Sequence, residues 1–367
     1  MRACPGQRTA RGLGSSREIS NGYAGSSLRI RLTGVVDWTQ ASWGPPAPVP
    51  HAHLASMSCS GLPPDLDHVL RWSAERRSAR LGRLTGERDE MPEMVEALDA
   101  VKSCARELGL DVEDAIVLRA TNNTVAWLAP LPVVAKIAAG HHGRLAAEIE
   151  VARLLAAAGA PVVPPADGIT ARVYRAGRFE MTFWRYEDQD RLADPGSAPV
   201  ARALAGRHRA LRGLGPAGGR WPRFDEELRG LQRRLDDAHF APELDTGDRN
   251  LLRSLLDDRL ARLRAQAPGT HVLHGSPHRL NILAVDGSPR FIDFETVCQG
   301  PLEWDLAHLE PEVARHYPLT LDDEVLRPCR VLASAKTAAW CWHSIHAGPD
   351  MRFHAEHHLQ VLREARP

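Results

Sequence analysis

The sequence predicts an α+β fold with two lobes, a small N-terminal lobe with an antiparallel sheet plus a helix and a mainly helical C-terminal lobe. Short apolar runs rich in β-branched residues are typical of strands; they occur at residues 115–120, 124–129, 132–138, 171–177 and 178–186. A long apolar helical pattern covers residues 144–159 among them. Beyond residue 194 helical periodicity dominates, most clearly at residues 201–214, 224–240, 250–266, 322–347 and 351–365.

The helical part is interrupted between residues 271 and 297. Two strand-like runs, 281–285 and 290–294, are joined there by the turn sequence Asp-Gly-Ser-Pro. We therefore predict a loop followed by a hairpin. Upstream of the sheet, residues 92–110 have the spacing of an amphipathic helix that ends at a glycine.

Three regions follow from this pattern. Residues 1–90 lack sustained periodicity and contain Pro-rich stretches, which predicts a disordered or loosely attached extension with a short helix around 67–84. Residues 91–187 form the small lobe, and residues 188–367 form the helical lobe. Two alternatives exist for the extension: its arginine-rich start is a targeting peptide, or translation begins at Met57 or Met91.

Composition excludes several classes of function. The formal net charge is zero and the pI is about 7.3, so no electrostatic drive toward nucleic acid or an anionic membrane surface is expected. Apolar runs are too short to span a bilayer. The six cysteines are scattered without a Cys-x-x-Cys pair, which favours a reduced cytoplasmic protein. No feature indicates an oligomeric state.

The loop and hairpin carry chemistry-bearing residues in a fixed order. The loop reads His-Gly-Ser-Pro-His-Arg-Leu-Asn over residues 274–281, and Ile-Asp-Phe-Glu follows at residues 292–295. An asparagine and an aspartate on adjacent strand ends supply hard oxygen ligands of the kind that Mg²⁺ prefers. The alternative is that Asn281 caps a turn and Asp293 a strand end.

The ordered set resembles the aminoglycoside phosphotransferase and choline kinase-like family of small-molecule kinases, which has a protein-kinase-like fold. That family carries H-G-D-x-H-x-x-N, then I-D-[FW]-E, then G-P-x-x-x-D-L-A, and this chain matches with Gly300, Pro301, Asp305, Leu306 and Ala307. The resemblance implies ATP and Mg²⁺ as cofactors and a hydroxylated small molecule as acceptor. It further implies that Asn281 and Asp293 bind Mg²⁺, and that His274 and His278 shape the loop.

Lys136 lies in a predicted strand with the sequence Val-Val-Ala-Lys-Ile-Ala. It resembles the kinase lysine that holds the nucleotide phosphates, and Glu148 on the next helix would be its ion-pair partner. The chain has 46 lysines and arginines together, and only Lys102, Lys136 and Lys336 are lysines. The alternative is a surface lysine beside an exposed helix face, which the flanking apolar residues disfavour.

Two further nucleotide contacts are predicted from their order along the chain. The phosphate-covering loop would fall at Asn122, Asn123 and Thr124, where no glycine is present and the polar side chains would replace close backbone approach. An ordinary Asn-rich turn is the alternative. The segment that contacts adenine would run from Phe183 to Glu187, including Arg185.

Ser276 occupies the position of the family's catalytic aspartate. Serine lacks comparable basicity, so three hypotheses follow. Phosphoryl transfer persists, either because a loose transition state needs little base assistance or because Glu295, Asp305 or His278 substitutes. Alternatively, the chain is a catalytically impaired pseudokinase that binds a nucleotide or small molecule. Finally, Ser276 itself receives phosphate. We favour an active phosphotransferase, because the rest of the apparatus is present.

Other clusters have less specific interpretations. The spacing of His271, His274 and His278 would suit zinc, but no cysteine cluster or H-E-x-x-H motif accompanies it. Cationic aminoglycoside acceptors would require an acidic pocket, for which the candidates are Asp225, Glu226, Glu227, Asp236 and Asp237. The alternative for these acids is a solvated helix face with interleaved arginines.

Overall fold

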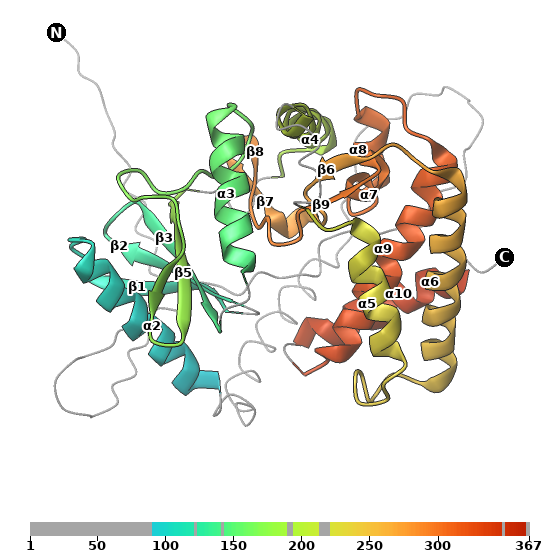
Figure 1. Cartoon of the computed structure of the whole chain (residues 1–367), viewed down its shortest axis with the longest axis horizontal. Helices are drawn as coiled ribbons and strands as arrows, with labels where there is room; N and C mark the ends of the chain where they lie inside the picture. Colours follow the sequence, from blue (N-terminus) through green and yellow to red (C-terminus); the bar gives the residue numbers. More distant parts are fainter. Residues whose placement is uncertain are drawn as a thin grey trace, which may run out of the picture.

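The computed structural model describes residues 90–120, 123–140, 143–188, 194–212, 221–346 and 349–364. The extension at residues 1–89 and Asn122 of the predicted phosphate loop lie outside the described residues. Within the described part, the structure has the two-lobed α+β architecture that the sequence predicts (Figure 1).

The small lobe contains a five-stranded antiparallel sheet in the order β1-β2-β3-β5-β4. Its elements are α2 (Glu90–Glu107), β1 (Asp114–Ala120), β2 (Thr124–Ala129), β3 (Val133–Ala139), α3 (Arg144–Ala157), β4 (Tyr174–Ala176) and β5 (Phe179–Arg185). Each of the predicted strands is present, because runs of β-branched and aromatic residues pack well on a pleated surface.

The two faces of this sheet are covered by different helices. Ala135 and Ile137 of β3 point to one face, where they share a buried apolar cluster with Leu98 and Val101 of α2. Successive side chains of a strand point to opposite faces, so Lys136 lies on the other face. That face is turned toward α3 (Figure 1).

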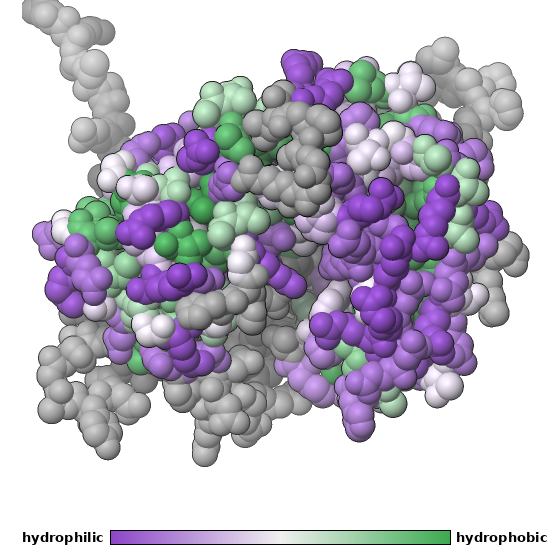
Figure 2. All heavy atoms as spheres, in the orientation of Figure 1, coloured by the Kyte–Doolittle hydropathy of each residue, from purple (hydrophilic) through white to green (hydrophobic). Residues whose placement is uncertain are grey.

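The helical lobe is built from α4 (Ser197–Arg212), α5 (Phe224–Leu235), α6 (Thr246–Gln266), α7 (Leu302–Leu306), α8 (Pro311–His316), α9 (Asp323–His343) and α10 (Pro349–Glu364). α6, α9 and α10 share its largest buried apolar cluster, and the surface over α5 and α6 is mainly hydrophilic (Figure 2). α7 and α8 were not predicted, because such short helices do not show a repeated apolar pattern. In the described part, no helix has both the length and the apolar character needed to cross a membrane.

Two small antiparallel ladders interrupt the helices. β6 (His271–Leu273) pairs with β9 (Cys298–Gly300), and β7 (Ile282–Val285) forms a hairpin with β8 (Ser288–Phe291). The predicted strand at residues 290–294 was wrong at its C-terminal end. β8 ends at Phe291, and Asp293 has a φ of +67°, which is incompatible with extended backbone.

Gly275 allows the 274–281 loop to approach the segment that follows β8. Its φ is +90°, and a Cβ at this position would lie 1.9 Å from the carbonyl oxygen of Thr296. The Thr296 hydroxyl in turn donates a hydrogen bond to the carbonyl of His274 at 3.1 Å. Only glycine satisfies both the backbone conformation and the close approach.

We predict that Gly275→Ala lowers the free energy of unfolding by about 3 kcal/mol, from left-handed strain together with a steric clash. Gly287→Ala is the matched control, because Gly287 also has a positive φ, +70°, but has no atom within 4 Å of a Cβ. It should cost only about 1 kcal/mol. Denaturant unfolding of both variants measures the difference; equal losses would contradict the proposed clash.

Candidate functional site

Lys136 and Glu148 form a buried ion pair between the sheet and α3. The Lys136 ammonium donates to both carboxylate oxygens of Glu148, at 3.0 and 2.9 Å. The Glu148 side chain is only 1% exposed and that of Lys136 only 9%. The pairing that the sequence predicts between β3 and the following helix is therefore observed.

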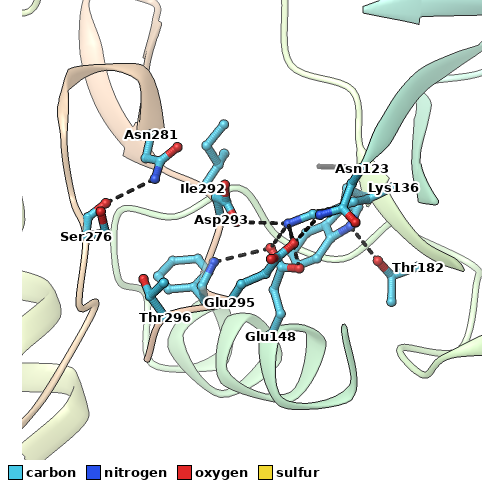
Figure 3. A network of polar contacts seen from close by, with 12 residues as sticks. Asn123, Lys136, Glu148, Thr182, Ser276, Asn281, Ile292, Asp293, Glu295 and Thr296 are labelled. Carbon is cyan, nitrogen blue, oxygen red and sulfur yellow. Dashed lines mark hydrogen bonds and ion pairs between the residues drawn. The ribbon is translucent and has the colours of Figure 1, made fainter. Parts of the chain in front are cut away.

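Two carboxylates from the helical lobe's hairpin segment complete the environment of the same ammonium (Figure 3). Asp293 accepts from Lys136 at 2.9 Å, and a Glu295 oxygen lies 2.6 Å from the ammonium nitrogen. The backbone N–H of Phe294 donates to Glu148 at 3.2 Å. Groups from both lobes therefore meet at this lysine. From the sequence, Glu295 was a candidate only for a substitute base, and its contact with Lys136 was not predicted.

Three carboxylates around one ammonium give the cluster an excess of negative charge. Burial opposes the charge on Lys136, but Glu148, Asp293 and Glu295 raise its pKa above the ordinary value. Burial raises the pKa of Glu148 to about 7, against the opposing effect of Lys136. The carboxylate oxygens lie within 4.8 Å of one another, as metal ligands do, but their common partner in this structure is the lysine.

Asn281 and Asp293 lie on neighbouring segments, at the end of a 3-10 turn before β7 and just after β8. The Asn281 amide nitrogen donates to the backbone carbonyl of Ser276 at 3.0 Å. Its buried side-chain oxygen has no hydrogen-bond partner among the described residues. Lys136 keeps the pKa of Asp293 below its ordinary value although burial acts to raise it. Both side chains thus offer hard oxygen atoms at one place.

Asp305 holds the backbone at the start of the 274–281 loop. This fully buried carboxylate accepts hydrogen bonds from the N–H groups of His274 and Gly275, at 3.0 and 2.8 Å. Arg207 and His208 of α4 bind the same carboxylate. Burial acts to raise the pKa of Asp305, but Arg207 and these donors hold it far below its usual range. So many donors leave Asp305 unsuitable as a base.

The two loop histidines occupy different positions. His274 is buried, its Nε2 lies 3.0 Å from the carbonyl oxygen of Ile292, and burial lowers its pKa to about 3. His278 is half-buried, with Nε2 3.3 Å from the Asn281 amide nitrogen, and burial lowers its pKa to about 4. His271, His274 and His278 belong to no metal-like group of side chains in the described part of the chain.

The predicted nucleotide contacts lie near Lys136 to different degrees. The Asn123 amide donates to Glu295, and Thr124 is the first residue of β2. Phe183 is buried in the cluster on the α2 face of the sheet, opposite Lys136. Arg185 is exposed at the end of β5 and pairs with Asp167 at 2.9 Å. These four assignments stay predictions.

A family model described as the phosphotransferase enzyme family matches residues 105–328, which is more than half of the chain. The chain belongs to this family. The resemblance to aminoglycoside phosphotransferases and choline kinase-like proteins that the sequence motifs indicate is confirmed. No curated protein matches the sequence.

Solved structures show that this chain has the bilobal protein-kinase-like fold. Amicoumacin kinase hAmiN, in complex with AMP-PNP, Ca²⁺ and Ami, matches with a TM-score of 0.58 and 12% identity over 76% of this chain and 97% of that chain. The GDP and kanamycin complex of APH(2")-IIIa matches with a TM-score of 0.55 and 15% identity over 73% of this chain and 98% of that chain. A choline/ethanolamine kinase family protein from Mesorhizobium loti matches with a TM-score of 0.52 and 17% identity over 72% of this chain and 94% of that chain.

The acidic residues in and just after α5 do not form a patch of free negative charges. Asp225 pairs with Arg223 and Arg229, and Asp236 pairs with Arg253. The Glu227 carboxylate forms an ion pair with the ammonium of Lys336 on α9, at 2.7 Å. Each of these three carboxylates has a basic partner. Glu226 accepts a hydrogen bond from the backbone N–H of Arg223, and Asp237 accepts one from that of His239. The interpretation as a helix face with interleaved arginines is therefore favoured over an acidic acceptor pocket.

We expect buried histidines to make the stability of this protein dependent on pH. Burial lowers the pKa of His208 to about 4 and those of His274 and His308 to about 3. As pH falls from about 6.5 toward 4, the unfolded chain binds protons that the folded protein does not, so stability decreases by up to about 1.4 kcal/mol per pH unit for each histidine. Glu148 acts in the opposite direction, because its pKa is raised. It is one group against these three histidines and His278, whose pKa is also lowered.

We predict that His308→Gln makes the loss of thermal stability between pH 6.5 and 4.5 shallower than in the wild type, because one buried titrating group is removed. Glutamine keeps a polar side chain near the Trp304 carbonyl that His308 Nδ1 now contacts at 2.8 Å. His316→Gln, at an exposed position, is the control and should leave the slope unchanged. Parallel curves for His308→Gln and the wild type would contradict the assignment.

Proposed function

We propose that this protein transfers the γ-phosphoryl group of ATP to a hydroxyl group of a small molecule. The observation that carries the proposal is the junction of Lys136, Glu148 and Asp293, in which groups from both lobes meet at one ammonium. The fold neighbours include complexes with AMP-PNP and with GDP and kanamycin, which supports a nucleotide donor and a small-molecule acceptor. These relatives favour catalysis over a binding-only role.

The residues present fit a Mg²⁺ ion. Asn281 has a buried side-chain oxygen without a partner in the described part of the chain, and Asp293 is an ionised carboxylate whose pKa Lys136 keeps low against burial. Oxygen ligands of this kind are the ones that Mg²⁺ takes at kinase sites. Asn281 and Asp293 would hold the ion, which when bound would neutralise charge on the nucleotide phosphates.

Lys136 is the phosphate-binding cation in this proposal. Its ammonium is held by Glu148 on the rigid frame of β3 and α3, so it needs no reorganisation to face a phosphate. In this structure the Lys136 ammonium contacts Asp293. When a nucleotide binds, its phosphates would replace Asp293 as the partner of the ammonium. Glu148 would remain as the group that positions the lysine.

Ser276 leaves the acceptor without a strong base. Asp305 is engaged by several donors, Glu295 is paired with Lys136, and His278 with its lowered pKa is a neutral but weakly basic imidazole. In our proposal the Ser276 hydroxyl orients the acceptor by a hydrogen bond. The acceptor oxygen bonds to phosphorus as the bond to ADP breaks, and its proton leaves late to a phosphate oxygen or water.

We predict that Lys136→Met weakens Mg-ATP binding at least tenfold, about 1.4 kcal/mol, because the phosphates lose their buried cation. Mg-ATP should raise the thermal midpoint of the wild type and of Lys102→Met. Lys102 is the control because it lies on α2 and pairs with Asp114 at 3.5 Å.

Unliganded midpoints establish whether both variants fold. Glu148 can take up a proton when its partner is lost, so the folded state should survive in Lys136→Met. An undiminished ATP shift in Lys136→Met would contradict the assignment of the lysine. No shift for the wild type would contradict ATP as the donor.

A further inference from the structure

A β-bulge in β1 changes the face to which Arg119 points. Ala115 and Val117 are buried on the α2 face, so regular alternation would place Arg119 on the same face. The register shifts between Val117 and Arg119, however, so that Arg119 rather than Leu118 pairs with Val125 of β2. Bulges of this kind re-aim side chains and are common beside active sites.

The new register aligns Arg119 with the phosphate-binding lysine proposed above. Arg119 is paired with Val125, Val125 with Lys136 of β3, and Lys136 with Thr182 of β5. Directly paired residues of neighbouring strands project from the same face of a sheet. Arg119 therefore shares the face of Lys136, two strands away, or about 10 Å along the sheet. Two long side chains at this spacing can reach one phosphate group from two sides.

The Arg119 side chain is half-buried, and it makes no hydrogen bond or ion pair with the side chain of another described residue. Lys136 on the same face reaches across the junction of the lobes to Asp293 at 2.9 Å. An arginine with no counterion among the described residues thus lies on the face of the sheet that meets Asp293.

We propose that Arg119 binds the terminal phosphate of the nucleotide and stabilises the phosphoryl group during its transfer. The proposal rests on the function proposed above. The planar guanidinium matches two phosphate oxygens at once and stays protonated throughout. The bond between the terminal phosphorus and the bridging oxygen of ADP breaks, and a bond from this phosphorus to the acceptor oxygen forms. Arg119 takes part only through hydrogen bonds and charge. A cation here compensates for the weak base, because a loose transition state carries its charge on these oxygens.

The test separates the terminal phosphate from the rest of the nucleotide. Dissociation constants for ATP and ADP, both with Mg²⁺, are measured by calorimetry for wild type, Arg119→Gln and Arg119→Lys. We expect Arg119→Gln to weaken ATP about tenfold and to leave ADP unchanged, because only ATP carries the phosphate that Arg119 contacts. Arg119→Lys should recover part of the difference, since lysine keeps the charge without the fork.

Arg178→Gln is the matched control, an exposed arginine of the same lobe that pairs with Glu93 and Glu96 of α2. It should bind both nucleotides as the wild type does. Equal weakening of ATP and ADP in Arg119→Gln, or no weakening of either, would overturn the proposal for Arg119 alone. A wild-type protein that binds neither nucleotide would instead overturn the proposed function.

Discussion

The Lys136 ammonium is an interaction through which the two lobes depend on each other. Glu148 binds it from the small lobe, and Asp293 and Glu295 bind it from the segment after β8. A buried charge that loses its partner costs several kcal/mol, so the sheet, α3 and this segment are constrained together. Burial raises the pKa of Glu148, and the nearby Asp293 and Glu295 add to the rise. The same excess of carboxylates would favour the nucleotide-bound metal that we propose for this place.

A second constraint keeps the 274–281 loop in place whichever side chain stands at residue 276. Asp305 holds the loop through backbone N–H groups, and Gly275 allows its close contact with Thr296. Neither interaction uses the side chain of Ser276. If Ser276 takes the position of the family's aspartate, as we propose, the replacement would remove a base but leave the frame of the loop in place. Such a frame, with cations around the phosphates, supplies most of what phosphoryl transfer requires.

The sequence predicted the strands and the motif residues better than the contacts between distant residues. Apolar periodicity located the sheet strands, and motif spacing indicated Lys136, Glu148, Asn281 and Asp293. The positive φ of Asp293 was not predictable, because the Ile-Asp-Phe-Glu run has the composition of a strand. The pairing of Asp305 with Arg207 joins residues 98 positions apart, and nothing local in an arginine-rich helix distinguishes that arginine. The bulge before Arg119 depends on the pairing register with β2, which composition does not encode.

Phosphoryl transfer itself tests the central claim most directly. The protein is incubated with Mg-ATP and a panel of hydroxylated amines and antibiotics, and phosphorylated products are detected by mass spectrometry. The account predicts a phosphorylated product with the wild type, a faster reaction with Ser276→Asp, and none with Asp293→Asn. ATP binding by the wild type without any phosphorylated product or ADP above the level of Asp293→Asn would contradict it and indicate a nucleotide-binding protein without catalysis.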